Sequence, residues 1–335
     1  MVSRLKVALV GSESLLGREI RDLAAETAPE LDLRLIAAEE GRAGLLTVLG
    51  DEPALVTALD AENLSGMRAI VLAGSEASSQ KALELAAGEP GATIIDLTFA
   101  AEDIPGARLR APAVELEPDE DDGAVYIVAH PAAIALALFL RRLHAHDPIR
   151  RSVIQIFAPA SERGAEGIEE LQAQTVSLLS FKSLPKAVFD AQLAFSLLAR
   201  YGDQAPLPLD RAELRIERHL AALLALPGEG EGAPMPSLRV IQAPVFHGYS
   251  FSAWVELEGN PGIEALESGL ACEWIDVRGA DAEPPNNVGN AGQGGIAVGG
   301  IAEDASHPDA CWFWVVADNL KLAAENALGV VRRLA

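Results

Sequence analysis

Two glycines, Gly11 and Gly17, bracket a short segment between an apolar run and an amphipathic stretch. In a strand–loop–helix unit, such a segment turns tightly and presents free backbone amides to the pyrophosphate of a dinucleotide. The middle position, where a glycine would let the backbone approach the phosphates, is Ser14, and Glu13 brings a carboxylate close to them. The segment predicts either a dinucleotide site or a strand–turn–helix corner without a ligand. Its candidate cofactor-binding residues are Gly11, Ser12, Glu13, Ser14, Leu15, Leu16 and Gly17.

Acidic residues follow the second expected strand, where a dinucleotide-binding fold holds the adenosine ribose. Glu39 and Glu40 stand there, and an acidic side chain at this place commonly bonds the ribose hydroxyls. Carboxylates repel a 2′-phosphate, so they favour NAD over NADP, although Arg42 offers a partial counter-charge. The alternative is an acidic turn that only faces solvent.

Two histidines stand where a proton could be transferred. His130 immediately precedes Pro131 and a long apolar stretch, so it is either the N-cap of a helix or an acid–base group. His247 lies two residues before Tyr249, and within a strand both side chains would share one face. We expect no metal site.

The elements that position these residues alternate between strands and helices in the first 130 residues. This alternation predicts a parallel sheet with helices on its faces. The expected strands are Val7–Val10, Leu33–Ala37, Arg68–Ala73 and Thr93–Asp96, and the expected helices are Leu15–Ala28 and Ser78–Ala87.

After Pro131 the pattern changes to longer strands, which predict a mixed or antiparallel sheet. The last strand and helix are expected to return to the first domain, giving domains of 1–130 with 311–335 and of 131–310. Acidic Glu115–Asp122 and glycine-rich Gly228–Gly232 are expected to be solvated loops. The expected strands are Val153–Phe157, Leu238–Pro244, Ser250–Leu257 and Cys311–Val316; the expected helices are Ala132–His144, Gly167–Leu179, Ala187–Ala199, Arg211–Leu226 and Leu320–Leu334.

Composition limits the classes of function. A formal charge of −23 over 335 residues argues against nucleic acid and anionic membranes as partners. The apolar run Tyr126–Leu140 is too short and too interrupted for a bilayer span. The chain enters a strand at once, without the pattern of a signal peptide. Its two cysteines, Cys272 and Cys311, make no disulfide framework, so we expect a cytoplasmic protein.

Several of these segments together resemble the aspartate-semialdehyde dehydrogenase family over nearly the whole chain. The Gly11 loop is similar to the family's Gly-Ala-Thr-Gly-x-Val-Gly, and Ala73-Gly-Ser to its Ala-Gly-Gly/Ser loop. The resemblance places Gly74 along the dinucleotide. It also places Asn319, in Asp318-Asn-Leu320, near the nicotinamide. Gln242-Ala-Pro-Val-Phe-His-Gly-Tyr-Ser250 resembles the family's Arg-Val-Pro-Val-x-x-Gly-His-Ser.

The residues that carry the family's chemistry are replaced. The nucleophilic cysteine of Asn-Pro-Asn-Cys falls on Ala133 when His130-Pro131 is aligned, and a methyl group cannot attack a carbonyl. The general-base histidine falls on Tyr249, so His247 and His130 are the stand-in candidates. Three further replacements are the substrate arginine by Gln242, the phosphate arginine by Glu102 and the positioning glutamine by Ala158.

The resemblance implies a Rossmann-like domain that binds NAD or NADP and an α/β dimerisation domain with a mixed sheet, joined as a homodimer. It implies an amino-acid-biosynthesis enzyme, an NADP-dependent oxidoreductase, from which this chain would descend as a pseudoenzyme that still binds a small molecule. Two alternatives remain. One is an NAD-dependent oxidoreductase that transfers hydride directly on another substrate, with Tyr249 or His247 as the acid–base group. The other is a regulatory dimer without a small ligand.

Overall fold

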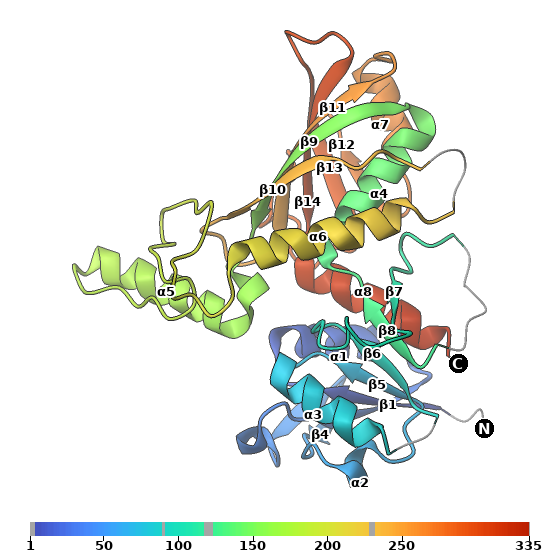
Figure 1. The fold of residues 1–335 in the computed structure, drawn as a ribbon, viewed down its shortest axis with the longest axis vertical. Helices are drawn as coiled ribbons and strands as arrows, with labels where there is room; N and C mark the ends of the chain where they lie inside the picture. Colours follow the sequence, from blue (N-terminus) through green and yellow to red (C-terminus); the bar gives the residue numbers. More distant parts are fainter. Residues whose placement is uncertain (1–3, 89–90, 117–122, 228–231, 335) are drawn as a thin grey trace. The chain divides into compact units, whose positions relative to one another are not determined.

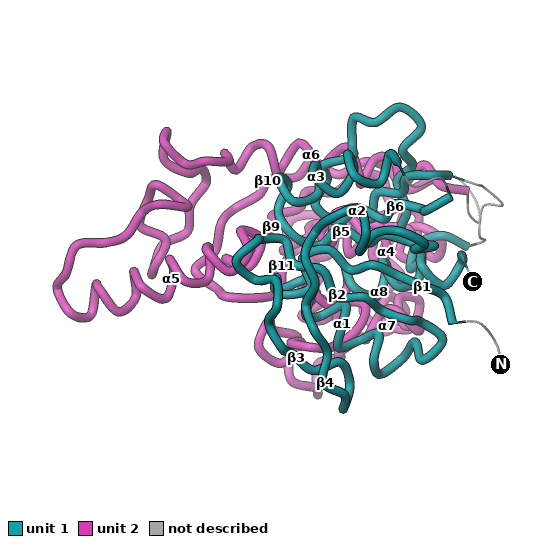
Figure 2. The backbone as a smooth tube through the Cα atoms, turned by 90° about the horizontal axis from the view of Figure 1, so that it is seen from below, with its two compact units in different colours: residues 1–129, 323–335 teal, residues 130–322 magenta. Residues whose placement is uncertain are grey.

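The computed structural model describes residues 4–88, 91–116, 123–227 and 232–334, which form two compact units (Figure 2). Unit 1 comprises the described residues of 1–129 and 323–335, and unit 2 those of 130–322. The α/β prediction is confirmed for both units, because each is built on one six-stranded sheet with helices packed on it (Figure 1).

The sheet of unit 1 is parallel throughout and has the order β2-β1-β5-β6-β8-β7. The chain leaves β1 toward β2 and returns to the other side of β1 through β5, so the direction of winding reverses between β1 and β5. In open α/β sheets, ligands bind at the carboxyl ends of strands at such a reversal. The strands are β1 Leu5–Val10, β2 Leu31–Ile36, β5 Ala69–Leu72, β6 Thr93–Asp96, β7 Arg108–Arg110 and β8 Val125–Val128.

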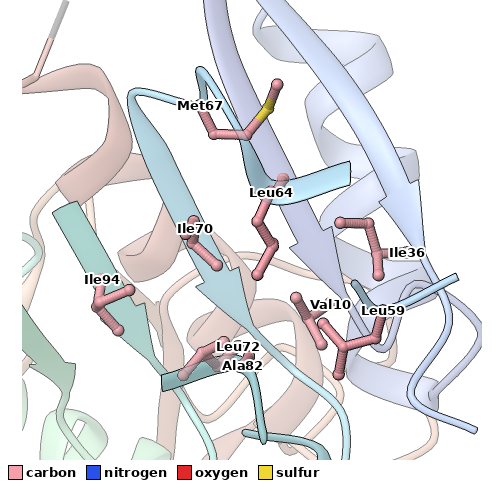
Figure 3. Packing of buried hydrophobic residues seen from close by; sticks show 10 residues of the cluster. Val10, Ile36, Leu59, Leu64, Met67, Ile70, Leu72, Ala82 and Ile94 are labelled. Atoms are coloured by element: carbon pink, nitrogen blue, oxygen red, sulfur yellow. The ribbon is translucent and has the colours of Figure 1, made fainter. Parts of the chain in front are cut away.

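The core of unit 1 forms because these strands are apolar on both faces. Val10, Ile36, Ile70 and Leu72 meet in one buried cluster that Leu64 closes (Figure 3). Apolar strands covered on both faces are typical of parallel sheets. The covering and connecting elements are α1 Leu15–Thr27, α2 Ala61–Leu64, α3 Glu76–Ala86, the 3-10 turn Glu40–Arg42 and the hairpin β3 Leu46–Leu49 with β4 Glu52–Leu55.

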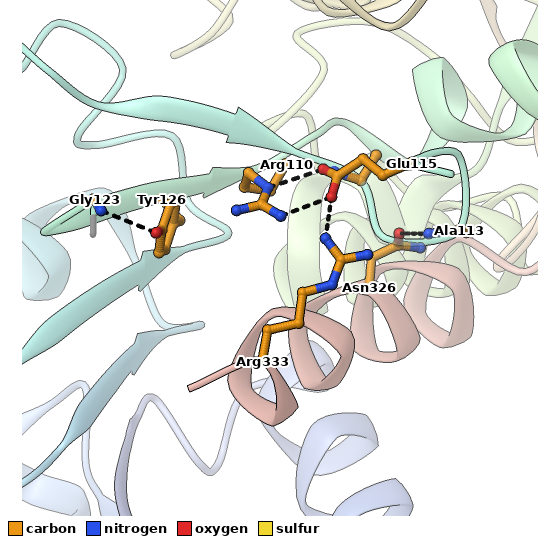
Figure 4. Close-up of polar contacts among 8 residues, drawn as sticks. Arg110, Ala113, Glu115, Gly123, Tyr126, Asn326 and Arg333 are labelled. Carbon is orange, nitrogen blue, oxygen red and sulfur yellow. Dashed lines mark hydrogen bonds and ion pairs between the residues drawn. The ribbon is translucent and has the colours of Figure 1, made fainter. Parts of the chain in front are cut away.

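A buried ion pair fastens the C-terminal helix α8 (Asn319–Arg332) to the strand β7 within unit 1. The carboxylate of Glu115 accepts hydrogen bonds from Arg110 Nε at 3.0 Å, from Arg110 Nη2 at 2.8 Å and from the amide of Ala111 at 2.7 Å. Arg333, just beyond α8, donates to the same carboxylate (Figure 4). The expectation of a solvated loop is therefore wrong at Glu115, because four hydrogen bonds from three residues compensate its burial. Residues 117–122 lie outside the described residues.

The sheet of unit 2 is mixed, with the order β10-β9-β11-β14-β13-β12. Its three central pairings are antiparallel, and both edge strands pair in parallel. The strands are β9 Ile149–Ala158, β10 Ser237–Gln242, β11 Tyr249–Leu257, β12 Ile275–Arg278, β13 Ile296–Glu303 and β14 Ala310–Ala317. The helices are α4 Pro131–His146, α5 Gly164–Leu179, α6 Leu209–Leu224 and α7 Ile263–Leu270, with a 3-10 turn at Ala160–Arg163.

The two faces of this sheet differ. Along β11, side chains from Tyr249 to Leu257 alternate between fully buried and partly exposed positions. The buried face packs against α4, where the rings of Phe139 and Phe313 lie 5.2 Å apart. The other face carries Trp254 and the 41 % exposed Trp312. One face of the sheet thus forms the core and the other presents large apolar side chains.

Two predictions at the level of elements are wrong. The strand Cys311–Val316 does not return to the first domain, because β14 lies between β11 and β13 in the second sheet. The chain passes from unit 2 back to unit 1 within α8, between Leu322 and Ala323. The segment Ala187–Ala199 is not a helix, and Asp190 and Phe195 have φ values of 46° and 62°. Side chains of α5 bind its backbone instead: Glu170 accepts from the amide of Val188, and Gln174 from that of Leu193.

No helix among the described residues is both long and apolar enough to cross a bilayer.

Candidate functional site

The glycine loop lies at the reversal point of the first sheet. Gly11 follows β1 with φ of +83°, and a Cβ built on it would lie 2.3 Å from the Cα of Gly74, which follows β5. A Cβ on Gly17 would lie 2.0 Å from the carbonyl oxygen of Gly11. Only glycine permits these approaches, so all three glycines are required to bring the two strand ends and the start of α1 together.

Ser14, at the place of the family's middle glycine, is the N-cap of α1. Its hydroxyl accepts from the amide of Gly17 at 2.8 Å and donates to the carbonyl of Ala73 at 2.7 Å. By helix geometry, the amides of Leu15 and Leu16 have no intrahelical acceptor. The serine therefore fixes the loop to β5 while leaving the start of α1 with donors for an anion.

Three carboxylates lie near the carboxyl end of β2. Glu39 and Glu40 have side chains that are 78 % and 95 % exposed, and they approach Arg42 and Lys81 respectively. Glu13 reaches the same strand end from the loop: its Oε1 accepts from the amide of Ala38 at 2.7 Å. Next to it, the buried hydroxyl of Ser12 donates to the carbonyl of Ile36 at 3.3 Å. The loop residues and Gly74 thus form one contiguous site in unit 1.

The helix expected to carry the nucleophile is present in unit 2. His130 caps α4, because its Nδ1 accepts from the amide of Ala132 at 3.2 Å, and Pro131 occupies the first helical position. The backbone amide of His130 donates to Nδ1 of His219 at 2.9 Å. Ala133 is fully buried in the first turn. The N-cap interpretation of His130 is therefore confirmed, and the first turn of α4 carries the buried methyl groups of Ala132 and Ala133.

A carboxylate that the sequence reasoning missed joins His130 to Tyr249. Glu162 Oε1 lies 2.8 Å from Nε2 of His130, and its Oε2 accepts from the Tyr249 hydroxyl at 2.6 Å. Since Nδ1 of His130 is an acceptor, the partners assign the Nε2 proton to this contact. The sequence feature that could have identified Glu162 is its place in Ser161-Glu-Arg-Gly164, where the family motif has glycine.

The environment sets the protonation of this cluster. Burial would raise the pKa of Glu162, but the attraction and hydrogen bond of His130, the bond from Tyr249 and the charge of Arg163 together hold it below its ordinary value. Burial first, and then the charge and hydrogen bond of Glu162, raise the pKa of Tyr249 well above its ordinary value. The tyrosine is therefore a neutral donor held against a carboxylate, and its side chain is buried.

The side chain of Gln242, which the resemblance predicts to replace the substrate arginine, is also hydrogen-bonded. Gln242 is fully buried; its Oε1 accepts from the Tyr201 hydroxyl at 2.6 Å and its Nε2 donates to the carbonyl of Ala158 at 2.9 Å. The guanidinium of Arg163 lies 6.0 Å from the centre of the Tyr201 ring. Tyr201, which the sequence reasoning also missed, thus lies between Gln242 and Arg163, whose charge is one of the causes that lower the pKa of Glu162.

Asn319 belongs to unit 2 and ties two loops of this cluster together. Its Oδ1 accepts from the hydroxyl of Ser161 at 3.2 Å and from the amide of Gly248 at 3.1 Å. Its place near a nicotinamide stays a prediction. His247 lies in the turn before β11, and Gly248 has φ of +81°. The strand alternation that would put His247 beside Tyr249 is therefore interrupted at Gly248.

Comparisons with known proteins agree with this architecture. Residues 140–322 match the family model described as semialdehyde dehydrogenase, dimerisation domain. The chain is 29 % identical to the USG-1 protein homolog of Pseudomonas aeruginosa, over 98 % of this chain and 97 % of that protein. It is 27 % identical to an aspartate-semialdehyde dehydrogenase of Rickettsia bellii, over 100 % and 98 % of the two chains.

A solved structure extends the likeness to the fold. The aspartate semialdehyde dehydrogenase II of Vibrio cholerae, complexed with ASA, superimposes with a TM-score of 0.82 at 22 % identity, covering 99 % of this chain and 98 % of that chain. The family model spans more than half of the chain, and the curated relatives align along its whole length. The chain is therefore a divergent member of the aspartate-semialdehyde dehydrogenase family, with that family's semialdehyde dehydrogenase dimerisation domain.

Proposed function

We propose that this chain is a homodimeric, NAD(P)-binding paralogue of aspartate-semialdehyde dehydrogenase that does not perform the phosphorylating dehydrogenase reaction. The observation that carries the proposal is Ala133, fully buried in the first turn of α4 at the position of the nucleophile. The family reaction passes through a thioester on cysteine, and a methyl group forms none. Without that covalent step, the substrate carbonyl has no attacking group at this helix.

Neither cysteine of the chain supplies a substitute thiol. In β14, Cys311 pairs with Val255 whereas Ala317 pairs with Tyr249, so about 20 Å of strand separates Cys311 from the tyrosine. Burial, followed by the charges of Glu303 and Asp304, raises the pKa of the Cys311 thiol. A raised pKa disfavours the reactive thiolate. Cys272 bridges to Ile275 of the edge strand β12, and β13 and β14 stand between that strand and β11.

The remaining catalytic positions support the same proposal. At the position of the base, Tyr249 is buried and its hydroxyl donates a hydrogen bond to Glu162. At the position of the substrate arginine, Gln242 is neutral and bonded to Tyr201 and Ala158. A closed set of hydrogen bonds occupies the place where the family binds and activates its substrate. The same observation does not favour direct hydride transfer, since Tyr249 would first have to release Glu162.

The first unit fits a dinucleotide. The close approach of Gly11, Gly17 and Gly74, the start of α1 and the topological reversal are the features that hold a pyrophosphate. A bound nicotinamide would supply hydride exchange. The residues of the chain would bind the phosphates with the amides of Leu15 and Leu16 and would place a carboxylate at the ribose, which leads us to propose NAD rather than NADP.

The open face of the second sheet supports the homodimer. Trp254 and Trp312 lie on the face opposite to α4. Large apolar side chains on one sheet face are typical of a protein–protein contact. We propose that a second copy of the chain covers this face, as the matched dimerisation domain implies.

The test is an assay of the purified protein with aspartate semialdehyde, phosphate and either NAD or NADP, following the absorbance of reduced nicotinamide. We expect no turnover above buffer from the wild type, from Ala133→Cys or from the matched control Ala132→Cys. Restoring the thiol alone is insufficient because catalytic residues act as a unit. Turnover by the folded wild type would overturn the proposal.

Nucleotide binding is tested separately by thermal unfolding. A ligand present at about 100 times its Kd stabilises the native state by about 2.7 kcal/mol, so millimolar NAD should raise the melting temperature. A melting temperature that neither nucleotide changes would favour the regulatory dimer without a small ligand.

A further inference from the structure

The carboxylate of Glu13 is fixed at one oxygen and unsatisfied at the other. Its Oε1 accepts from the backbone amide of Ala38 at 2.7 Å, directly beyond the carboxyl end of β2. Its Oε2 is buried and has no hydrogen-bond partner among the described residues. A buried carboxylate oxygen without a donor is rare in folded proteins, because it has lost water and gained nothing in exchange. The first oxygen therefore positions a second oxygen that is free to accept a bond.

The place of this oxygen is where dinucleotide-binding folds recognise the adenosine ribose. An acidic side chain at the end of the second strand accepts from the ribose 2′-hydroxyl when the ligand is NAD. The acidic residues shortly after β2, Glu39 and Glu40, project into solvent and face Arg42 and Lys81. Glu13 brings a carboxylate to the same strand end from the glycine loop.

Local packing fixes the position of the residue that binds Glu13 relative to the glycine loop. A Cβ on Gly74 would lie 2.8 Å from the side chain of Ala38 and 3.3 Å from the Cα of Gly11. The residue whose amide binds Glu13 thus lies against Gly74, and Gly74 in turn lies against Gly11 of the loop. A ligand whose pyrophosphate lies on the start of α1 would bring its adenosine ribose toward this carboxylate.

We infer that Glu13 recognises the adenosine ribose and sets the preference of this chain for NAD over NADP. The inference rests on the proposed dinucleotide function. The free Oε2 accepts the 2′-hydroxyl of NAD, which satisfies the orphaned oxygen. A 2′-phosphate removes that donor and sets a charge of about −1.5 to −2 against the carboxylate. Glu39 and Glu40, by this account, contribute little to the choice.

The experiment measures the dissociation constants of NAD and NADP by isothermal titration calorimetry. The proteins are the full-length wild type, Glu13→Gln, and the matched controls Glu39→Gln and Glu40→Gln. Glutamine keeps an oxygen for the Ala38 amide but replaces the acceptor with a donor that suits a phosphate. We expect the wild type to bind NAD about 10-fold or more tightly than NADP, which corresponds to about 1.4 kcal/mol. Glu13→Gln should reduce that ratio about 10-fold, and each control should change it less than about twofold.

Circular dichroism and the melting temperature without ligand establish that each variant is folded. The inference is overturned, with nucleotide binding intact, if the wild type binds both nucleotides equally, if Glu13→Gln leaves the ratio unchanged, or if Glu39→Gln or Glu40→Gln moves it instead. Binding that appears only in Glu13→Gln would overturn it too, because Glu13 would then block the site. If no protein binds either nucleotide, the inference and the proposed dinucleotide function both fall.

Discussion

Replacing Tyr249 by phenylalanine tests whether Glu162 is held as a carboxylate by its neighbours. The change removes one hydroxyl and leaves the ring, which stacks on Phe251 with centroids 5.7 Å apart, so no large cavity forms. The lost interaction is a 2.6 Å hydrogen bond to a carboxylate. Bonds to charged groups contribute about 1.5–3 kcal/mol. We therefore expect Tyr249→Phe to lower the free energy of unfolding by about 2 kcal/mol near neutral pH.

The loss of unfolding free energy in Tyr249→Phe should be smaller at low pH than at neutral pH. The pKa of Glu162 is lowered in the folded state from its ordinary value of 4.5. A group of this kind stabilises the fold fully above its unfolded pKa, and the contribution is lost as the pH falls through the folded pKa. Without the tyrosine donor the pKa of Glu162 should rise toward 4.5. The difference between wild type and variant should therefore be complete near neutral pH and should shrink as the pH falls below about 4.5.

Tyr201→Phe is the matched control. Tyr201 is also a buried phenol with a 2.6 Å hydrogen bond, but its acceptor is the neutral amide of Gln242. We expect a loss of about 1 kcal/mol that does not change over the same pH range. The assay is urea unfolding followed by circular dichroism at several pH values. Equal losses for the two variants, or a Tyr249→Phe loss that is constant with pH, would refute the reasoning about Glu162.

Three further predictions concern other parts of the chain. Gly17→Ala should destabilise unit 1 by about 1–3 kcal/mol through overpacking, because its Cβ would meet the Gly11 carbonyl at 2.0 Å, whereas Gly41→Ala meets nothing within 4 Å and should be nearly neutral in urea unfolding. Glu115→Gln should cost about 3–5 kcal/mol by leaving buried charge uncompensated. Burial would raise the pKa of Glu115, but bonds from Arg110, Ala111 and Arg333 lower it. The loss of unfolding free energy in Glu115→Gln should therefore become smaller at pH values below 4.5, and a loss that does not change with pH would contradict this. Trp312→Glu should convert the proposed dimer to a monomer in light scattering, and an unchanged mass would remove this face from the proposed interface.

The sequence predicted the fold wherever one local signal determined the structure. A glycine followed by an amphipathic run predicted the loop and α1, and the apolar run after Pro131 predicted α4. The segment Ala187–Ala199 failed for a physical reason, since its helical composition is overridden by bonds from Glu170 and Gln174 to its amides. Such tertiary competition leaves no periodic trace in the segment itself.

The candidate site could be predicted in part. The sequence left His130 open between a helix cap and an acid–base group, and the structure shows the cap. The alignment of His130-Pro131 predicts that Ala133 stands at the nucleophile position. The link between His130 and Tyr249 could not be predicted, because it passes through Glu162, which lies 32 residues from the one and 87 from the other. Similarly, Glu13 was expected to face a phosphate, whereas its bond to Ala38 turns it toward the end of β2.

The irregular segment after α5 has a consequence for how unit 2 opens. Glu170 binds the amides of Val188 and Phe189, and Gln174 binds those of Leu193 and Ala194. Four amides in a segment without regular structure thus depend on two buried side chains of one helix. A fluctuation that unwinds this turn of α5 would release all four at once. The helix and the segment it holds should therefore exchange their amide hydrogens as one cooperative unit, although only the helix has a repeating ladder of its own.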